Sequence, residues 1–265
     1  MNDFNYHRPK TLQEAVATRK ARPEGKYLAG GMSLLPVMKL DMASPSDLIS
    51  LSALAELQGV QVDGPALLIG AGTTHATVAS HEAVKGTIAA LAMLADHIGD
   101  PQVRNRGTLG GSVSHADPSA DYPAAVVGLK GVLRTDRRAI PADDFFKKGM
   151  FETALADDEI VVGVRFERPE KAGYAKFSNP ASKYALVGVF VAKYADGVRV
   201  AVTGAGPAVF RVPAMEAALS KSFTEQAVAN VKVPAAGLNE ELGASADYRA
   251  HLITVMARRA VASAR

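Results

Sequence analysis

Two glycine pairs at the ends of short apolar runs constrain the fold of this chain more than any other feature. The pair at 30–31 follows a predicted strand at 26–29, and the pair at 110–111 lies in "RGTLGGSVSHADPSAD". Glycine adopts positive φ and lacks the Cβ that would keep a ligand at a distance, and successive N–H groups in such turns bind anions. Each loop alone is better explained as an ordinary turn. Together they predict two nests for the two phosphates of a dinucleotide.

The segments around the glycine pairs mix short strands with helices, which predicts an α+β fold. Strands are expected at 26–29, 47–51, 66–70, 131–134 and 159–166, and helices at 11–20, 86–98 and 122–129. Gly99 and Pro101 are expected to end the second of these helices. A regular βα alternation with a G-x-G-x-x-G motif is missing from the sequence, which argues against a doubly wound parallel sheet.

From about residue 174 the pattern changes. The alternating runs 184–194 and 198–206 meet at Asp196 and Gly197, which predicts a hairpin. Helices follow at 213–221 and in the last segment, where Tyr248, Leu252 and Met256, together with Val255, form one apolar stripe. Strands followed by helices predict a separate C-terminal α+β domain with an antiparallel sheet.

The composition excludes several kinds of site. The chain has no cysteine, so it holds no disulfide, no thiolate nucleophile and no cysteine-ligated iron–sulfur cluster. A net charge of +3 favours an anionic small molecule but is too diffuse to indicate a nucleic acid partner. No apolar run approaches the roughly 20 residues of a transmembrane segment, and the N-terminus lacks a signal core, so a cytoplasmic location is expected.

Two other kinds of site are disfavoured by the sequence around the second glycine pair. His115 with Asp117 and Asp121 offers too few convergent ligands for a metal. Ser114 with the same histidine lacks a nucleophile elbow, which argues against a hydrolase triad. No catalytic residue and no metal ligand are therefore assigned to this chain. Arg104 and Arg106 beside the loop are candidates for a phosphate or for a partner carboxylate, and solvated surface charges are the alternative.

The two glycine segments, "AGGMSLLPVMKL" and "GDPQVRNRGTLGGSVSHADPSAD", resemble the FAD-binding medium subunit of the molybdenum hydroxylases, the group of carbon monoxide dehydrogenase and xanthine dehydrogenase. The resemblance runs from "FNYHRPKTLQEAV" through "AGTTHATV" and "IPADDFF" to "DYRAHLITVMARRAV". It implies a p-cresol-methylhydroxylase-type FAD-binding domain of two subdomains, expected at 1–172. A small C-terminal α+β domain is expected at 173–265, with FAD extended in the cleft between them.

Carried over position by position, the resemblance implies a set of cofactor-binding residues. The first diphosphate loop is Ala29, Gly30, Gly31, Met32 and Ser33, and the second is Thr108, Leu109, Gly110, Gly111 and Ser112. Asp121 matches an acidic flavin contact, Val161 and Lys176 match further contacts, and Tyr184 matches a position beside the isoalloxazine. Thr73, Thr74 and His75 are placed near the flavin by the resemblance, whereas threonine there also predicts an ordinary helix cap; both interpretations stay open. Lys183 departs from the family, which commonly has an aspartate before the aromatic residue.

The resemblance also implies partners. Substrate would be oxidised at a molybdenum cofactor on a large subunit, and electrons would pass through two [2Fe–2S] clusters of a small subunit to non-covalent FAD on this chain. FAD would then reduce an external acceptor, in an assembly expected to be a dimer of heterotrimers. The lack of cysteine agrees with clusters held by another chain. A flavin-free scaffold subunit and a self-sufficient flavin oxidoreductase are the alternatives.

Overall fold

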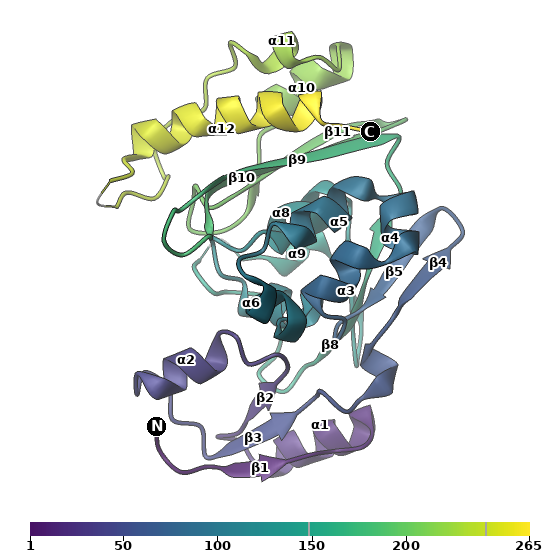
Figure 1. Cartoon of the computed structure of the whole chain (residues 1–265), viewed down its shortest axis with the longest axis vertical. Helices are drawn as coiled ribbons and strands as arrows, with labels where there is room; N and C mark the ends of the chain where they lie inside the picture. The colour runs from purple at the N-terminus through teal and green to yellow at the C-terminus, as the bar shows by residue number, and fades with distance from the viewer. Residues whose placement is uncertain (148, 242) are drawn as a thin grey trace.

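The protein is described by a computed structural model that covers residues 1–147, 149–241 and 243–265. Figure 1 shows three parts stacked along the long axis, with the N-terminal part at the bottom and the C-terminal part at the top. The bottom part is a three-stranded sheet in the order β1-β3-β2, in which both neighbouring pairs are parallel. Its elements are β1 (Asn5–His7), α1 (Leu12–Ala21), β2 (Lys26–Leu28), α2 (Leu34–Lys39), β3 (Asp47–Ser50) and the 3₁₀ helix η1 (Ala55–Leu57).

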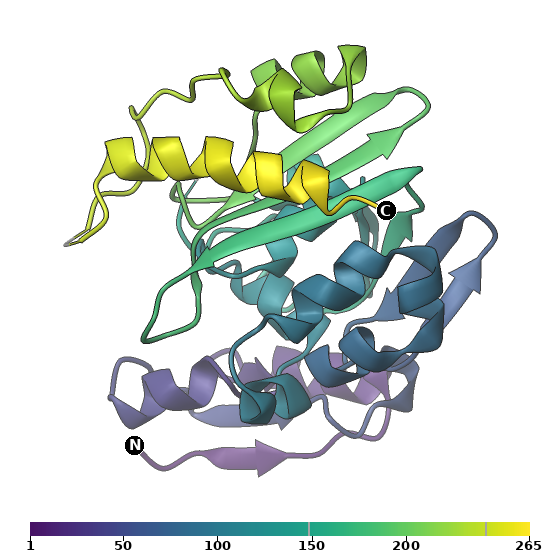
Figure 2. The ribbon, with the colours of Figure 1, turned by 45° about the horizontal axis from the view of Figure 1, so that its top comes forward.

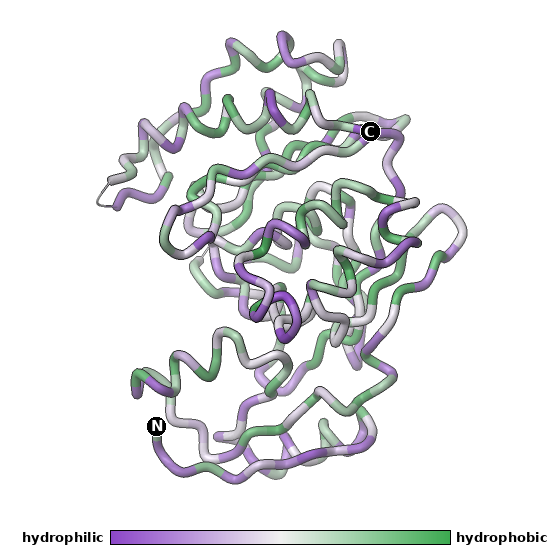
Figure 3. Tube along the Cα trace, viewed as in Figure 1, coloured by the Kyte–Doolittle hydropathy of each residue, from purple (hydrophilic) through white to green (hydrophobic). Residues whose placement is uncertain are grey.

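The middle part is a five-stranded sheet in the order β4-β5-β8-β6-β7 with antiparallel neighbours, packed against a group of short helices. Its strands are β4 (Val60–Asp63), β5 (Ala66–Gly70), β6 (Val132–Thr135), β7 (Ala139–Pro141) and β8 (Val161–Glu167). Its helices are α3 (His75–Ser80), α4 (Glu82–Thr87), α5 (Ala89–Asp96), α6 (Pro101–Arg106), α7 (Leu109–His115), α8 (Tyr122–Gly128) and α9 (Ala142–Phe145). Figure 3 shows α6 as the hydrophilic helix of this part.

The top part is a four-stranded antiparallel sheet in the order β12-β11-β10-β9. Its elements are β9 (Lys171–Ser178), β10 (Ala185–Tyr194), β11 (Gly197–Thr203), β12 (Phe210–Arg211), α10 (Pro213–Lys221), α11 (Glu225–Val228) and α12 (Ala246–Ala262). Figure 2 shows α12 lying across β9 and β10, and α5 and α8 contact the sheet from the other side.

The side chains of strand β10 belong to two different hydrophobic cores. Val187, Val189 and Val191 face the core under α12, whereas Phe190 and Ala192 face the core of the middle part. Because side chains alternate across a strand, one run of apolar residues serves both faces. The C-terminal sheet is therefore a shared wall between two hydrophobic cores.

The predicted α+β fold is confirmed, as are the predicted strands and the hairpin, whose β10 and β11 pair with Tyr194 opposite Gly197. The helix predicted at 86–98 is a correction: it is divided between α4 and α5, and α5 ends at Asp96, before Gly99 and Pro101 as expected. Pro101 also begins α6 at the first helical position, with the Asp100 carboxylate accepting a hydrogen bond from Val103 N at 2.9 Å. Strands β1, β4, β7, β9 and β12 were not predicted. The division at 172/173 stays a prediction; β9 begins at Lys171, close to it.

The apolar stripe predicted for α12 is partly wrong. Leu252 and Met256 are buried, but Tyr248 is 41% exposed. The buried face of α12 includes Arg249 in place of Tyr248. Arg249 Nη1 donates to the carbonyl oxygens of Leu186 (2.7 Å) and Gly204 (2.9 Å). These backbone partners lie far away in the sequence, so the pattern of the helix alone did not reveal them.

Candidate cofactor-binding cavity

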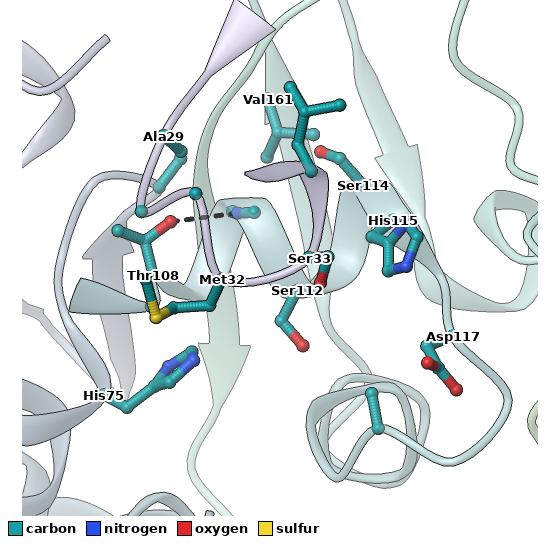
Figure 4. Close-up of a pocket in the computed structure, with 18 of the residues that line it drawn as sticks. Ala29, Met32, Ser33, His75, Thr108, Ser112, Ser114, His115, Asp117 and Val161 are labelled. Atoms are coloured by element: carbon teal, nitrogen blue, oxygen red, sulfur yellow. Dashed lines mark hydrogen bonds between the residues drawn. The ribbon is translucent and has the colours of Figure 1, made fainter. Parts of the chain in front are cut away.

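A cavity of about 1270 Å³ lies between the N-terminal part and the middle part, with one wall from the C-terminal part. The β2–α2 loop, the start of α3 and the α6–α7 junction line it, and the loop 179–184 contributes Ser182, Lys183 and Tyr184. Figure 4 shows side chains of the β2–α2 loop, the start of α3 and the α6–α7 junction converging on one space. The volume and the number of segments suit a large, extended ligand.

The first glycine loop presents open backbone donors to this cavity. The N–H groups of Gly30, Gly31, Met32 and Ser33 have no hydrogen-bond acceptor in the part of the chain that the structure describes. Gly31 has φ of +77°, and a Cβ on Gly30 would overlap the carbonyl oxygen of Arg106. The loop therefore needs glycine both for its turn and for its close approach to the α6–α7 junction. Four successive N–H groups without acceptors agree with the anion nest that the sequence predicts here, and their use by a phosphate stays a prediction.

The second glycine loop is different, and the prediction of a matching second nest is wrong. The N–H of Leu109 donates to Thr73 O (3.0 Å), that of Gly110 to Ala71 O (2.8 Å), and that of Gly111 to Thr108 Oγ1 (3.1 Å). These donors are used within the protein and are not free for a phosphate.

Packing explains the glycines of the second loop. A Cβ on Gly110 would overlap that of Ala71, so this position needs glycine to lie against the end of β5. A Cβ on Gly111 would instead lie 3.6 Å from Ala29 Cβ, so this position brings the second loop against the first. The two loops are thus neighbours, as predicted, but with unlike roles.

The 73–75 loop fits both interpretations that the sequence left open. Thr74 Oγ1 accepts a hydrogen bond from Thr77 N (3.2 Å) and caps α3, and the loop also lines the cavity. His75 is 5% exposed, and burial lowers its pKa to about 4, so the imidazole is neutral at pH 7. Its Nδ1 has no partner among the described residues, and its ring lies 5.3 Å from that of Tyr122. This nitrogen is enclosed by the protein's own atoms, so it is a buried polar group without a hydrogen bond to the described residues.

A buried ion pair includes one residue of the cavity wall. Asp121 Oδ1 accepts a hydrogen bond from the Tyr174 hydroxyl at 2.5 Å and lies 2.9 Å from Lys176 Nζ. Burial raises the pKa of the Asp121 carboxyl, and the Lys176 charge opposes that rise. Asp121 lines the cavity, and its Oδ2 has no partner among the described residues, so one carboxylate oxygen remains for a ligand.

The predicted cofactor-binding residues come together in this cavity with two exceptions. Leu109 is fully buried in the core, and the Lys176 side chain lies behind Asp121. The residues that do line it are Ala29, Gly30, Gly31, Met32, Ser33, Thr73, Thr74, His75, Thr108, Gly110, Gly111, Ser112, Asp121, Val161 and Tyr184.

Several lining residues were not assigned to the site from the sequence. Ile98 and Gly99 form a corner of the wall, although the sequence indicated only the end of a helix there. Phe151 lines the cavity with φ of +60° and packs 5.0 Å from the ring of His115, and no sequence signal marks it. Arg106 lines the cavity, whereas Arg104 donates to Ile98 O at 2.8 Å. Within the described ranges, no three ligand-type side chains gather as a metal site.

A loop with unbonded N–H groups in the wall of a large cavity, together with a neutral histidine and a buried carboxylate, suits a protein that binds an extended nucleotide cofactor. A family model described as the FAD binding domain in molybdopterin dehydrogenase matches residues 2–168. The chain belongs to this family, and FAD is its cofactor.

Relatives and solved structures agree over nearly the whole chain. The carbon monoxide dehydrogenase medium chain of Hydrogenophaga pseudoflava is 36% identical, covering 98% of this chain and 96% of the relative. The nicotine 6-hydroxylase medium subunit of Paenarthrobacter nicotinovorans is also 36% identical, covering 98% and 97%.

Among solved structures, carbon monoxide dehydrogenase from Hydrogenophaga pseudoflava superposes with a TM-score of 0.88 at 35% identity, covering 99% of this chain and 97% of that one. Quinoline 2-oxidoreductase from Pseudomonas putida 86 superposes with a TM-score of 0.91 at 26% identity, covering 98% and 96%. The predicted family, fold class and oxidoreductase assignment are confirmed. No helix among the described residues is long and apolar enough to span a bilayer.

Proposed function

We propose that this chain is the electron-transfer flavoprotein subunit of a heteromeric molybdenum hydroxylase. It takes electrons from [2Fe–2S] clusters on a partner subunit and passes them to an external acceptor. The observation that carries the proposal is the nest of four unbonded N–H groups at 30–33, which faces the cavity in a chain of this family. A diphosphate is the ligand that such a nest suits best.

Different residues of the cavity would hold different parts of FAD. The first loop supplies N–H donors for the diphosphate, and Gly111 leaves room beside it. Asp121 offers Oδ2, and the neutral His75 places no charge in the cavity wall. Bound FAD supplies the redox chemistry, because it accepts electrons singly or in pairs, while the protein supplies position and electrostatics.

The proposed partners are a large subunit with the molybdenum cofactor and a small subunit with the iron–sulfur clusters, arranged as a dimer of heterotrimers. Two of the relatives are themselves named as medium chains or subunits, which supports a larger assembly. The chain has no cysteine, so cluster ligands must come from another subunit. The proposed location is the cytoplasm, where reduced thiolates persist as cluster ligands.

The test is anaerobic mixing of the physiological substrate with the FAD-loaded chain and, separately, with the assembled complex, while flavin absorbance is followed. We expect bleaching only in the complex, because this chain alone has no route from substrate to flavin. Rapid bleaching by the isolated chain would replace the proposal with a self-sufficient oxidoreductase. A purified chain that takes up no flavin would favour the scaffold alternative.

A further inference from the structure

Lys176 lies behind the cavity wall, where three protein oxygens surround its ammonium group. Nζ lies 2.8 Å from His97 O and 3.2 Å from Lys183 O, with hydrogen bonds to both, and 2.9 Å from Asp121 Oδ1. An ammonium group has three hydrogens, so these oxygens match its full donor capacity. The side chain is 4% exposed and does not line the cavity. The Lys176 ammonium group is thus held by protein oxygens and lies outside the lining of the cavity.

The three oxygens belong to three separate segments at or beside the cavity wall. His97 ends α5, Asp121 precedes α8, and Lys183 lies in the loop between β9 and β10. Lys176 itself is on β9, so it joins the C-terminal sheet to two segments of the middle part. A charged group that satisfies acceptors from three segments holds them in one arrangement.

The loop 179–184 is shaped to meet this lysine. Asn179 closes it, donating its N–H to Tyr184 O (2.8 Å) and accepting that of Lys183 (2.9 Å). Lys183 has φ of +64°, a left-handed conformation that is uncommon for lysine and persists only where its surroundings hold it. Gly99 supplies part of that support, because a Cβ there would overlap Cβ of Lys183. The loop is therefore clamped between Lys176 and the α5–α6 corner.

We propose that Lys176 is a positioning residue that braces the Tyr184 loop and orients Asp121, rather than a direct contact of the cofactor. This inference rests on the proposed function only where it concerns FAD. Asp121 uses Oδ1 toward Lys176 and Tyr174, which directs Oδ2 toward the ligand. Tyr184, 43% exposed and in the cavity wall, is held in place by the same loop.

The experiment compares Lys176→Met with Lys176→Arg in the full chain. As a matched control, Lys193→Met removes a lysine of β10 that pairs with Glu170 at 3.0 Å on the surface. Amide exchange of 181–184 is measured in the protein freed of FAD, and the Kd for FAD is measured by flavin fluorescence. For Lys176→Met we expect exchange in this loop to quicken, and the Kd to rise, by about tenfold or more, from the loss of charged hydrogen bonds. Lys176→Arg should restore part of both, and the control should change neither.

Two results would contradict the proposed positioning role of Lys176. One is a higher Kd for Lys176→Met with unchanged loop exchange, which means direct contact with FAD. The other is no change in either measurement. If Lys176→Met does not fold, Gly99→Ala displaces the loop from the opposite side and should quicken the same amides while Lys176 stays intact; unchanged exchange there also refutes the inference. If the wild-type chain binds no FAD, the proposed function fails. The amide-exchange data still test whether Lys176 holds the 179–184 loop in place.

Discussion

Replacing Gly111 with alanine is expected to remove most of the bound FAD while leaving the fold intact, and Gly110→Ala is expected to damage the fold itself. An added Cβ at 111 lies 3.0 Å from Thr108 Oγ1 and 3.6 Å from Ala29 Cβ. Only the Thr108 hydroxyl therefore has to move. At 110 the same atom would overlap Ala71 Cβ and lie 2.8 Å from Ala71 O. A backbone neighbour cannot move away without shifting the end of β5.

The magnitudes follow from these contacts. In Gly111→Ala, a gain of about 1 kcal/mol in helix propensity offsets about 1 kcal/mol from a weakened Thr108 cap, so stability stays near that of the wild type. Gly110→Ala should lose about 1–3 kcal/mol from overpacking, a fall in Tm of several degrees. A methyl group between the loops should displace the diphosphate from one or two charged hydrogen bonds, worth about 1.5–3 kcal/mol each. The Kd for FAD should then rise about 10- to 100-fold in Gly111→Ala.

The assay pairs thermal unfolding of the FAD-free proteins with FAD titration. Wild-type FAD affinity in Gly111→Ala would show that the methyl group does not meet the cofactor, and the loop assignment would be wrong. An unchanged Tm in Gly110→Ala would contradict the packing explanation for that glycine.

Three further results are expected. Acid denaturation should release all flavin as FAD, because the chain has no cysteine for a thioether link and the nest suits a diphosphate; colour retained by the precipitate would contradict this. Neutral His75 should contribute about 3 kcal/mol of stability that is present above pH 6.5 and lost as the pH falls toward 4, because the unfolded state protonates first. Chemical denaturation across that range should show the slope, and His75→Phe should flatten it. Thr74→Ala should cost about 1 kcal/mol through its lost cap at α3, seen as a lower Tm.

The features that could be predicted from the sequence are those set by local chemistry. The hairpin followed from Gly197, whose φ is +143°, and from the alternation of valines in β10. The strands at β2 and β5 followed from apolar runs that end in glycine. Short strands such as β7 and β12 carry too few residues to show a period, so only their pairing partners define them.

The site was predicted best where its residues act through their own backbone. The N–H groups of the first glycine loop have no acceptor among the described residues, which agrees with the anion-binding use predicted from its sequence. The second loop has the same local pattern, but its amides bond to Thr73 and Ala71, which lie more than 30 residues earlier in the chain. Lys176 illustrates the same limit, since the oxygens of His97 and Asp121 reach it only through the tertiary fold. Long-range partners are not encoded in a local motif.

The contrast between the two glycine pairs explains how the cavity keeps open donors without losing its shape. Gly110 and Gly111 fix the second loop rigidly to β5 and to the first loop, with their own amides satisfied. The first loop packs through Gly30 against Arg106 and Gly107, directly before the second loop, and its amides at 30–33 have no acceptor among the described residues. Free amides cost about 1–3 kcal/mol each when dry, so water must occupy the nest until a diphosphate replaces it. FAD should therefore raise the Tm in proportion to the logarithm of its concentration, because it binds only where the second loop holds the first in place.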